Sequence, residues 1–100
     1  MNVAGGVRID EPAIDLPVAL ALASSFRDRV VAPDVIAFGE IGLAGEVRGV
    51  TRAGARLAEA AAMGFRRAIV PVSAANERRM ADDLEIVGVK TLGEALDAVL

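Results

Sequence analysis

The sequence predicts an α/β fold, in which helices and strands form stacked layers (α+β layered), for the single domain over residues 1–100. The segments alternate in the order β-α-β-β-α-β-(α)-β-α, which is typical of layered domains. Hydrophobic residues make up 54% of the chain and aromatic residues only 3%. This composition indicates a core of alanine, valine and leucine rather than a disordered chain.

The first elements are a strand and an apolar helix. Asn2–Ile9 predicts a strand with a bulge at its Gly-Gly pair. Asp15 is predicted to be the N-cap of a helix that continues to about Phe26. Because Leu16–Ala23 is apolar on all sides, we expect this helix to be buried centrally.

A glycine-rich hairpin follows at the centre of the chain. Val35–Phe38 and Glu46–Val50 are its two predicted strands, joined by a turn with glycines at Gly39, Gly42 and Gly45. Glycine permits positive φ and a close approach of the backbone. The hairpin either presents polar groups to a cleft or partner, or is a tight turn without chemistry.

The second half continues the alternation. Thr51 is predicted to cap a helix from about Arg52 to Met63, with Gly64 ending it. A buried strand is expected over residues 68–70 and another strand over residues 84–89, with a short, weaker helical segment between them from Ser73 to about Ala81. Thr91 and Glu94 form a capping box for a last helix. The core stripe of that helix is predicted to be Leu92, Ala95, Leu96 and Val99.

Composition also excludes several classes of protein. The net charge of −3 and the pI near 4.8 give no support for nucleic-acid binding by bulk charge. No apolar run reaches the ~18 residues of a membrane span, and the first residues of the sequence lack the basic and apolar regions expected of a signal peptide. The chain has no cysteine and no histidine, which excludes thiolate and histidine metal sites and favours a cytoplasmic location. No P-loop motif occurs. We therefore expect no metal and no cofactor in this chain.

Five segments of the chain have a distinctive sequence: Gly5–Pro12, Asp15–Leu16 with the helix that follows, Ser24–Arg29, Phe38–Arg48 and Gly64–Pro71. In this order they resemble the C-terminal domain of the RadA (Sms) family of bacterial DNA repair proteins. The resemblance implies a Lon protease-like domain, with a fold similar to the second domain of ribosomal protein S5. It also implies that this chain is the back portion of that domain, so the fold would be partial.

The resemblance further implies a role in a larger protein. Family members carry a zinc motif and a RecA-like ATPase before this domain, and act as hexameric, ATP-driven motors on branched DNA. The Lon-like domain would form the ring platform. ATP, Mg²⁺ and Zn²⁺ are expected only in the other parts of the parent protein. The expected partners are further copies of the chain and, through the parent, DNA, with no membrane.

The resemblance can be carried to the catalytic positions of Lon proteases, which use a serine-lysine dyad. The nucleophile position falls on Ala13 and the lysine position at or near Gly54. The nearest basic residues, Arg52 and Arg56, stay protonated and cannot accept the proton of a nucleophile. This implies a non-catalytic pseudo-protease. The alternative is an ATP-dependent serine peptidase of the Lon group, for which Ser73 with Lys90 is a conceivable but poor pair.

Two sets of charged residues, one acidic and one basic, remain as candidate sites. Gly39 and Glu40 form a G-E motif, and Gly45 lies later in the same turn. Glu40 is the best candidate for a polar residue that the fold holds in a fixed position. The carboxylates at positions 10, 11, 15, 40 and 46 either bind Mg²⁺ or act as acid and base, or belong to solvated loops, an N-cap and ion pairs. The basic candidates are Arg52, Arg56, Arg66, Arg67, Arg78 and Arg79. They would contact DNA phosphates or a neighbouring subunit, or form a solvated face.

Overall fold

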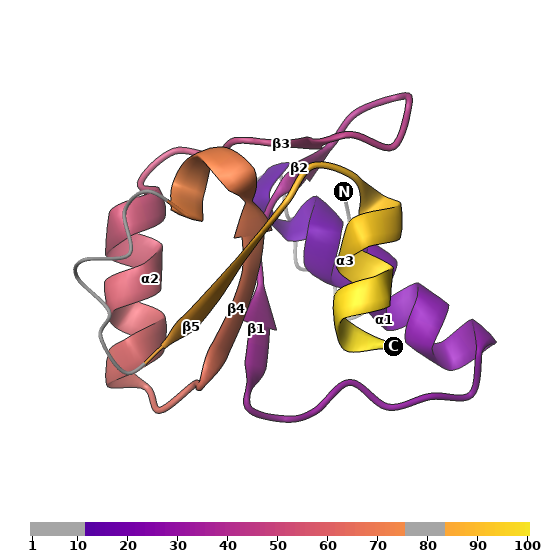
Figure 1. Cartoon of the computed structure of the whole chain (residues 1–100), viewed down its shortest axis with the longest axis horizontal. Helices are drawn as coiled ribbons and strands as arrows, with labels where there is room; N and C mark the ends of the chain where they lie inside the picture. Colours follow the sequence, from indigo (N-terminus) through magenta and orange to yellow (C-terminus); the bar gives the residue numbers. More distant parts are fainter. Residues whose placement is uncertain (1–11, 76–83) are drawn as a thin grey trace, which may run out of the picture.

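The computed structural model describes residues 12–75 and 84–100, and it confirms the predicted α/β class (Figure 1). Three parallel strands form the main sheet in the order β1-β4-β5, with β1 at Val35–Ala37, β4 at Arg67–Pro71 and β5 at Glu85–Val89. The predicted strand over Asn2–Ile9 and residues 76–83 lie outside the described residues.

Three helices and a hairpin complete the described chain. A 3-10 turn, η1 (Pro12–Ile14), leads directly into α1 (Asp15–Phe26). The antiparallel hairpin consists of β2 (Glu40–Ile41) and β3 (Val47–Arg48). The remaining helices are α2 (Ala53–Ala62) and α3 (Leu92–Val99), and residues 72–75 form a short 3-10 turn after β4.

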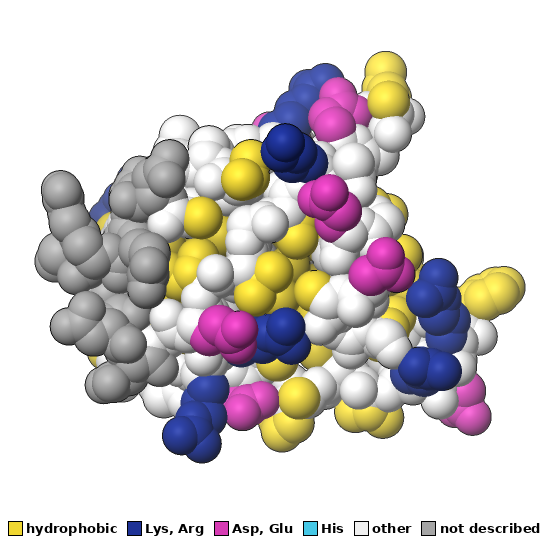
Figure 2. Space-filling view, viewed as in Figure 1, with side chains coloured by type: hydrophobic (Ala, Val, Ile, Leu, Met, Phe, Trp, Pro, Cys, Tyr) yellow, Lys and Arg dark blue, Asp and Glu magenta, His cyan; other side chains and the backbone are white. Residues whose placement is uncertain are grey.

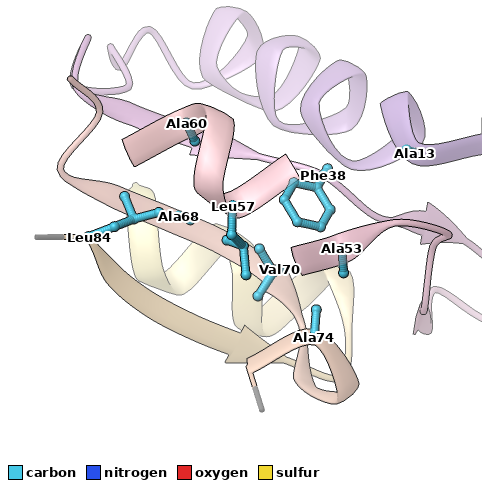
Figure 3. Packing of buried hydrophobic residues seen from close by; sticks show 9 residues of the cluster. All are labelled: Ala13, Phe38, Ala53, Leu57, Ala60, Ala68, Val70, Ala74 and Leu84. Atoms are coloured by element: carbon cyan, nitrogen blue, oxygen red, sulfur yellow. The ribbon is translucent and has the colours of Figure 1, made fainter. Parts of the chain in front are cut away.

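The helices cover the two faces of the sheet, α2 on one face and α1 with α3 on the other (Figure 1). Successive residues of a strand point to opposite faces. In β4, Ala68 and Val70 pack with Leu57 of α2, whereas Ile69 packs with Leu16 of α1. The α2 side of the core is shown in Figure 3. The uninterrupted apolar run of β4 is therefore explained by burial on both faces.

The start of α2 differs from the prediction, and its end agrees with it. Thr51 does not cap the helix, since the N-cap is Arg52 in the left-handed region (φ 60°) with no side-chain cap. Gly64 takes φ +92°, and its N–H donates to the Ala61 carbonyl at 3.1 Å. The N–H of Phe65 donates to the Ala60 carbonyl, which completes a Schellman motif.

The predicted central burial of α1 is wrong within the described residues. Only Leu16 and Leu20 are buried, whereas Leu22 is 67% exposed and Phe26 is 94% exposed. The physical reason lies in the sheet. Among the described strands, β1 is at the edge of the sheet, and the described elements that contact α1, namely η1, β1, β2 and α3, bury only its Leu16 and Leu20 side.

The predicted stripe and cap of α3 are confirmed. Ala95 is buried, and Leu92, Leu96 and Val99 pack against the same cluster. The Glu94 N–H donates to the Thr91 hydroxyl at 3.1 Å. The Glu94 carboxylate accepts from the Lys90 N–H, one residue earlier than a standard capping box would use.

Candidate functional site

The candidate site is the carboxyl edge of the sheet, where the hairpin lies beside the start of α1. The chain bends at Gly39, whose N–H donates to the Ala13 carbonyl and whose carbonyl accepts from the Leu16 N–H, both at 2.9 Å. A Cβ at Gly39 would lie 2.9 Å from Cγ1 of Val47. Glycine is thus required here for close approach, and it holds the hairpin against α1.

The two strands that form the hairpin differ from the two that the sequence predicted. Val35–Phe38 does not pair with Glu46–Val50, because β1 adds to β4 in parallel and the chain turns away at Gly39. The antiparallel pair is instead Glu40–Ile41 with Val47–Arg48. Alternation of apolar residues does not reveal which strand a segment pairs with, and this is why the error arose.

Only one of the three hairpin glycines uses positive φ. Gly45 has φ +83°, and its N–H donates to the Gly42 carbonyl at 3.0 Å. A Cβ at Gly42 would fall on the carboxyl group of Glu46. The absence of a side chain at Gly42 leaves that carboxylate room to accept the Ala44 N–H at 3.0 Å.

Three charged side chains lie together on the hairpin. Arg48 Nη2 is 2.9 Å from Glu46 Oε2, and Arg48 Nη1 is 3.7 Å from Glu40 Oε1. Glu40 and Arg48 are direct cross-strand partners. The pKa of Glu46 is lowered, first by its own backbone N–H, then by Arg48 and the Ala44 N–H. The position of Glu40 suits a role in holding the hairpin.

Asp15 has a different role from the predicted N-cap. Ile14 is the N-cap, with helical backbone angles and no side-chain cap, because η1 continues directly into α1. The Asp15 carboxylate accepts a hydrogen bond from the Ile41 N–H at 3.1 Å. Asp15 therefore joins the first turn of α1 to the hairpin.

The two positions assigned to the dyad, Ala13 and Gly54, both belong to segments that pack around the α2 core. Ala13 is 2% exposed and belongs to the cluster that contains Phe38 and Ala53, and Gly54 follows Ala53 in the first turn of α2 (Figure 3). A groove of about 260 Å³ lies beside Ala13, between η1, β1 and α2. Arg56 and Glu59 are its charged lining residues.

Two of the contacts of Arg56 show where its side chain lies. Its Nε donates to the Thr51 carbonyl at 3.0 Å, and its guanidinium lies 5.9 Å from the centroid of the Phe38 ring. These two contacts hold the Arg56 guanidinium beside the start of α2 and near the Phe38 ring. They add no group that can accept a proton, and Ala13 has no hydroxyl to give one.

The structure separates the predicted arginines into two pairs. Arg52 and Arg56 are at the start of α2, near the carboxyl edge of the sheet, whereas Arg66 and Arg67 are at the amino end of β4. Arg67 Nη1 donates to the Ala98 carbonyl at 3.1 Å, and its Nε is 3.4 Å from Glu85 Oε1. Arg67 thus has a structural role that ties α3 to the sheet. Arg78 and Arg79, like Asp10 and Glu11, are outside the described residues.

Two features of the site were missed in the sequence. Arg48 is the hub of the hairpin ion pairs, and its position opposite Glu40 was recognisable only with the correct strand register. Leu43 is fully exposed at the turn. A large apolar residue between glycines in a turn was the available signal for this exposure.

Over residues 12–75 and 84–100, no three histidine, cysteine, aspartate or glutamate side chains are grouped to hold a metal ion. In the same part of the chain, no helix has the length and apolarity needed to cross a membrane.

Comparison with protein families defines the class of this domain. The family model described as subunit ChlI of Mg-chelatase matches residues 1–74. The chain therefore belongs to this family.

Individual relatives agree with the resemblance found in the sequence. The chain is 48% identical over 100 residues to the DNA repair protein RadA of Halalkalibacterium halodurans. It is 50% identical over 97 residues to that of Escherichia coli and 44% identical over 100 residues to that of Listeria monocytogenes. The predicted relationship to RadA is confirmed. These alignments cover 96–100% of this chain but only 21–22% of the relatives, so the chain spans about a fifth of their length.

Proposed function

We propose that this chain is a non-catalytic, Lon-like assembly domain of a RadA-type DNA repair protein. In that role it is one domain of the larger protein and forms part of the platform of a ring, a hexamer in the parent. The relatives named DNA repair protein RadA support the repair role. The assembly role is our inference from the Lon-like resemblance and from the site.

The observation that carries the non-catalytic assignment is the buried methyl group of Ala13. Peptide hydrolysis by a serine-lysine dyad needs a hydroxyl that attacks and a neutral amine that takes its proton. Ala13 offers neither an attacking atom nor access, being 2% exposed, and Gly54 has no side chain. The Arg56 guanidinium on the same groove stays protonated.

The other functions of the parent protein belong to its other parts. ATP hydrolysis with Mg²⁺, and zinc binding, are proposed to lie outside this chain, in a cytoplasmic protein. Arg52 and Arg56 are proposed to contact DNA phosphates or a neighbouring subunit, because they share one end of the domain. Arg66 is an exposed second candidate, whereas Arg67 already holds α3.

The mass of the chain in solution tests the assembly role. We expect light scattering after size exclusion to give a mass above that of one chain, rising with concentration. A monomer at every concentration would contradict the assembly role of this chain.

The alternative, a Lon-group peptidase, has a direct test. We expect no hydrolysis of an unfolded protein substrate by the purified chain. Hydrolysis that persists through purification and is lost in Ser73→Ala would establish the peptidase instead.

A further inference from the structure

Strand β1 has an outer edge that faces away from β4. The backbone N–H and carbonyl groups of successive residues in a strand point alternately to its two edges. The Phe38 N–H donates to the Ile69 carbonyl of β4 at 3.1 Å, so the N–H and carbonyl of Ala37 point to the outer edge. Over residues 12–75 and 84–100, no backbone hydrogen bond forms on the outer side of Ala37, which is half-buried. An added strand can pair with these two groups.

The described chain closes this outer edge at both ends and leaves its middle open. At the carboxyl end of β1, the outward groups of Gly39 are bonded to η1 and the start of α1. At the amino end, the Val35 N–H donates to the Ala32 carbonyl at 3.2 Å. The open stretch between these two points suits a short extended segment.

An apolar groove lies on each side of the open edge. The groove of about 260 Å³ beside Ala13 is lined by Ile36 and Phe38 of β1. A second groove of about 390 Å³, the α1–β1 groove, is lined by Val35. Because successive residues of a strand point to opposite faces, the two grooves lie on opposite faces of the sheet.

The two grooves meet at the edge and are large enough for side chains. Pro17 and Ala37 line both of them. The remaining apolar lining of the α1–β1 groove comes from α1 and the segment after it, namely Leu20, Ala21, Val30 and Val31. A cavity of about 150 Å³ holds benzene, so each groove has room for an apolar side chain.

We propose that the open edge of β1 binds an extended apolar segment of a partner polypeptide, which adds to the sheet as a further strand. The side chains of an added strand alternate between the two faces of the sheet, so neighbouring residues enter the two grooves. A compact small molecule fills one groove but does not reach both faces of the edge. This interaction goes beyond the proposed assembly role and does not depend on it.

Charge disfavours a nucleic acid as the occupant. Arg56 and Glu59 are the charged residues of the two linings, and their formal charges cancel. A nucleic-acid backbone needs local positive charge, which these linings do not supply. On the face of the molecule shown in Figure 2, basic and acidic side chains are likewise intermixed.

A second folded copy does not fill the grooves either. The apolar side chains of the described edge strands already pack in the core of their own chain. Ile36 and Ile86 pack on the α2 side of the sheet, and Val35 and Val87 on the other side. Pairing of two folded copies along their edges supplies backbone partners but no side chains for the grooves. The occupant is therefore a segment that is not packed in such a core.

Peptide binding to the 100-residue chain tests the proposal. The probe is a fluorescent peptide, Lys-Thr-Val-Val-Val-Thr-Lys, whose binding is followed by fluorescence anisotropy. N-methylation of every second residue leaves one backbone edge intact, so we expect this peptide to bind. N-methylation of every residue removes both edges and should weaken binding at least about tenfold. Equal binding of the fully methylated peptide would overturn the added strand.

Two variants of the chain locate the site, with circular dichroism as a check of folding. Ala37→Pro removes the outward N–H, and proline is tolerated in edge strands. Ala21→Glu, a good helix former, fills the α1–β1 groove. We expect each variant to weaken binding at least about tenfold. Leu43→Ser is the matched control, because Leu43 is exposed but lines neither groove. Unchanged binding in Ala21→Glu would overturn the proposed site even if Ala37→Pro does not fold.

Amide hydrogen exchange at Ala37 identifies what covers the edge. We expect fast exchange in the free chain and slow exchange when the peptide is bound. Slow exchange in the free chain would overturn the proposal, because the chain itself or a second copy would then already cover the edge. Failure of the peptide to bind would also overturn it, and would leave the assembly role, which light scattering tests, intact. A monomer that binds the peptide would contradict the assembly role alone and support the peptide site.

Discussion

Helices α1 and α2 are both rich in apolar residues, but only α2 is matched to the surface it covers. The apolar residues of α2 fall on one face, with Ala53, Leu57 and Ala60 buried against the sheet. Those of α1 surround the helix, and only Leu16 and Leu20 are buried. A helix that is apolar on all sides therefore need not be buried on all sides by the described residues of its own chain.

The largest expected effect is a difference in the free energy of unfolding between truncation of a buried leucine of α2 and truncation of an exposed leucine of α1. Leu57→Ala should destabilise the fold by about 2–5 kcal/mol, because Leu57 is 0% exposed and its loss leaves a cavity. Leu22→Ala should change the free energy of unfolding by less than about 0.5 kcal/mol in the monomer. Urea unfolding of both variants measures the difference. Equal losses would mean that α1 is covered as fully as α2.

The attachment of α1 to the hairpin can be broken at one glycine. Gly39→Ala should cost about 1–3 kcal/mol, because its Cβ would lie 2.9 Å from Val47 and force a shift. Gly93→Ala in α3 is the matched control, since its Cβ would meet only the Thr91 hydroxyl, at 3.7 Å. Thermal unfolding should show a lower midpoint for Gly39→Ala alone. A neutral result there would indicate that the hairpin moves freely away from α1.

Helix starts provide a smaller contrast between α2 and α3. Thr91→Ala should destabilise by about 1 kcal/mol, because it removes the hydroxyl that accepts the Glu94 N–H. Thr51→Ala should cost less than about 0.5 kcal/mol, because α2 has no side-chain cap. The free energy of unfolding, measured by chemical denaturation, distinguishes the two variants. A similar loss at both positions would show that Thr51 caps α2 in solution.

The smallest expected effect is a dependence on pH from the hairpin. The pKa of Glu46 is lowered in the folded chain, first by its own backbone N–H and then by Arg48. Its contribution to stability is therefore complete above the unfolded pKa and is lost as the pH falls through the folded pKa. Thermal midpoints measured from neutral to acidic pH should fall less steeply in Glu46→Gln. Identical slopes would rule out this contribution.

Patterns that depend on neighbouring residues were predictable from the sequence. The capping pair Thr91 and Glu94, the Gly64 helix end and the stripe of α3 involve residues a few positions apart, and the sequence displays them directly. Features that depend on distant partners were not. Asp15 accepts from Ile41, 26 positions later, and β1 pairs with β4 rather than with the hairpin.

The residues of the candidate site also divide into features that the sequence predicted and features that it did not. Ala13 and Gly54 were assigned by motif, and the structure buries Ala13 in the core on the α2 side of the sheet and places Gly54 in the first turn of α2. Arg52 and Arg56 were grouped by their spacing of one helical turn, but the other arginines only by type, and the structure places Arg66 and Arg67 at the opposite end of the sheet. Residue type alone gives no position along a sheet.

The parallel order β1-β4-β5 also has a consequence for the order in which the strands and helices form during folding. Val35 pairs with Arg67, whereas Arg67 pairs with Glu85, which is a shorter separation along the chain. Closing the shorter loop costs less entropy, by on the order of 0.5 kcal/mol. We therefore expect β4, β5 and α3 to form the nucleus, with β1 and α1 joining later. Substitutions in α3 should slow folding, and those in α1 should mainly speed unfolding.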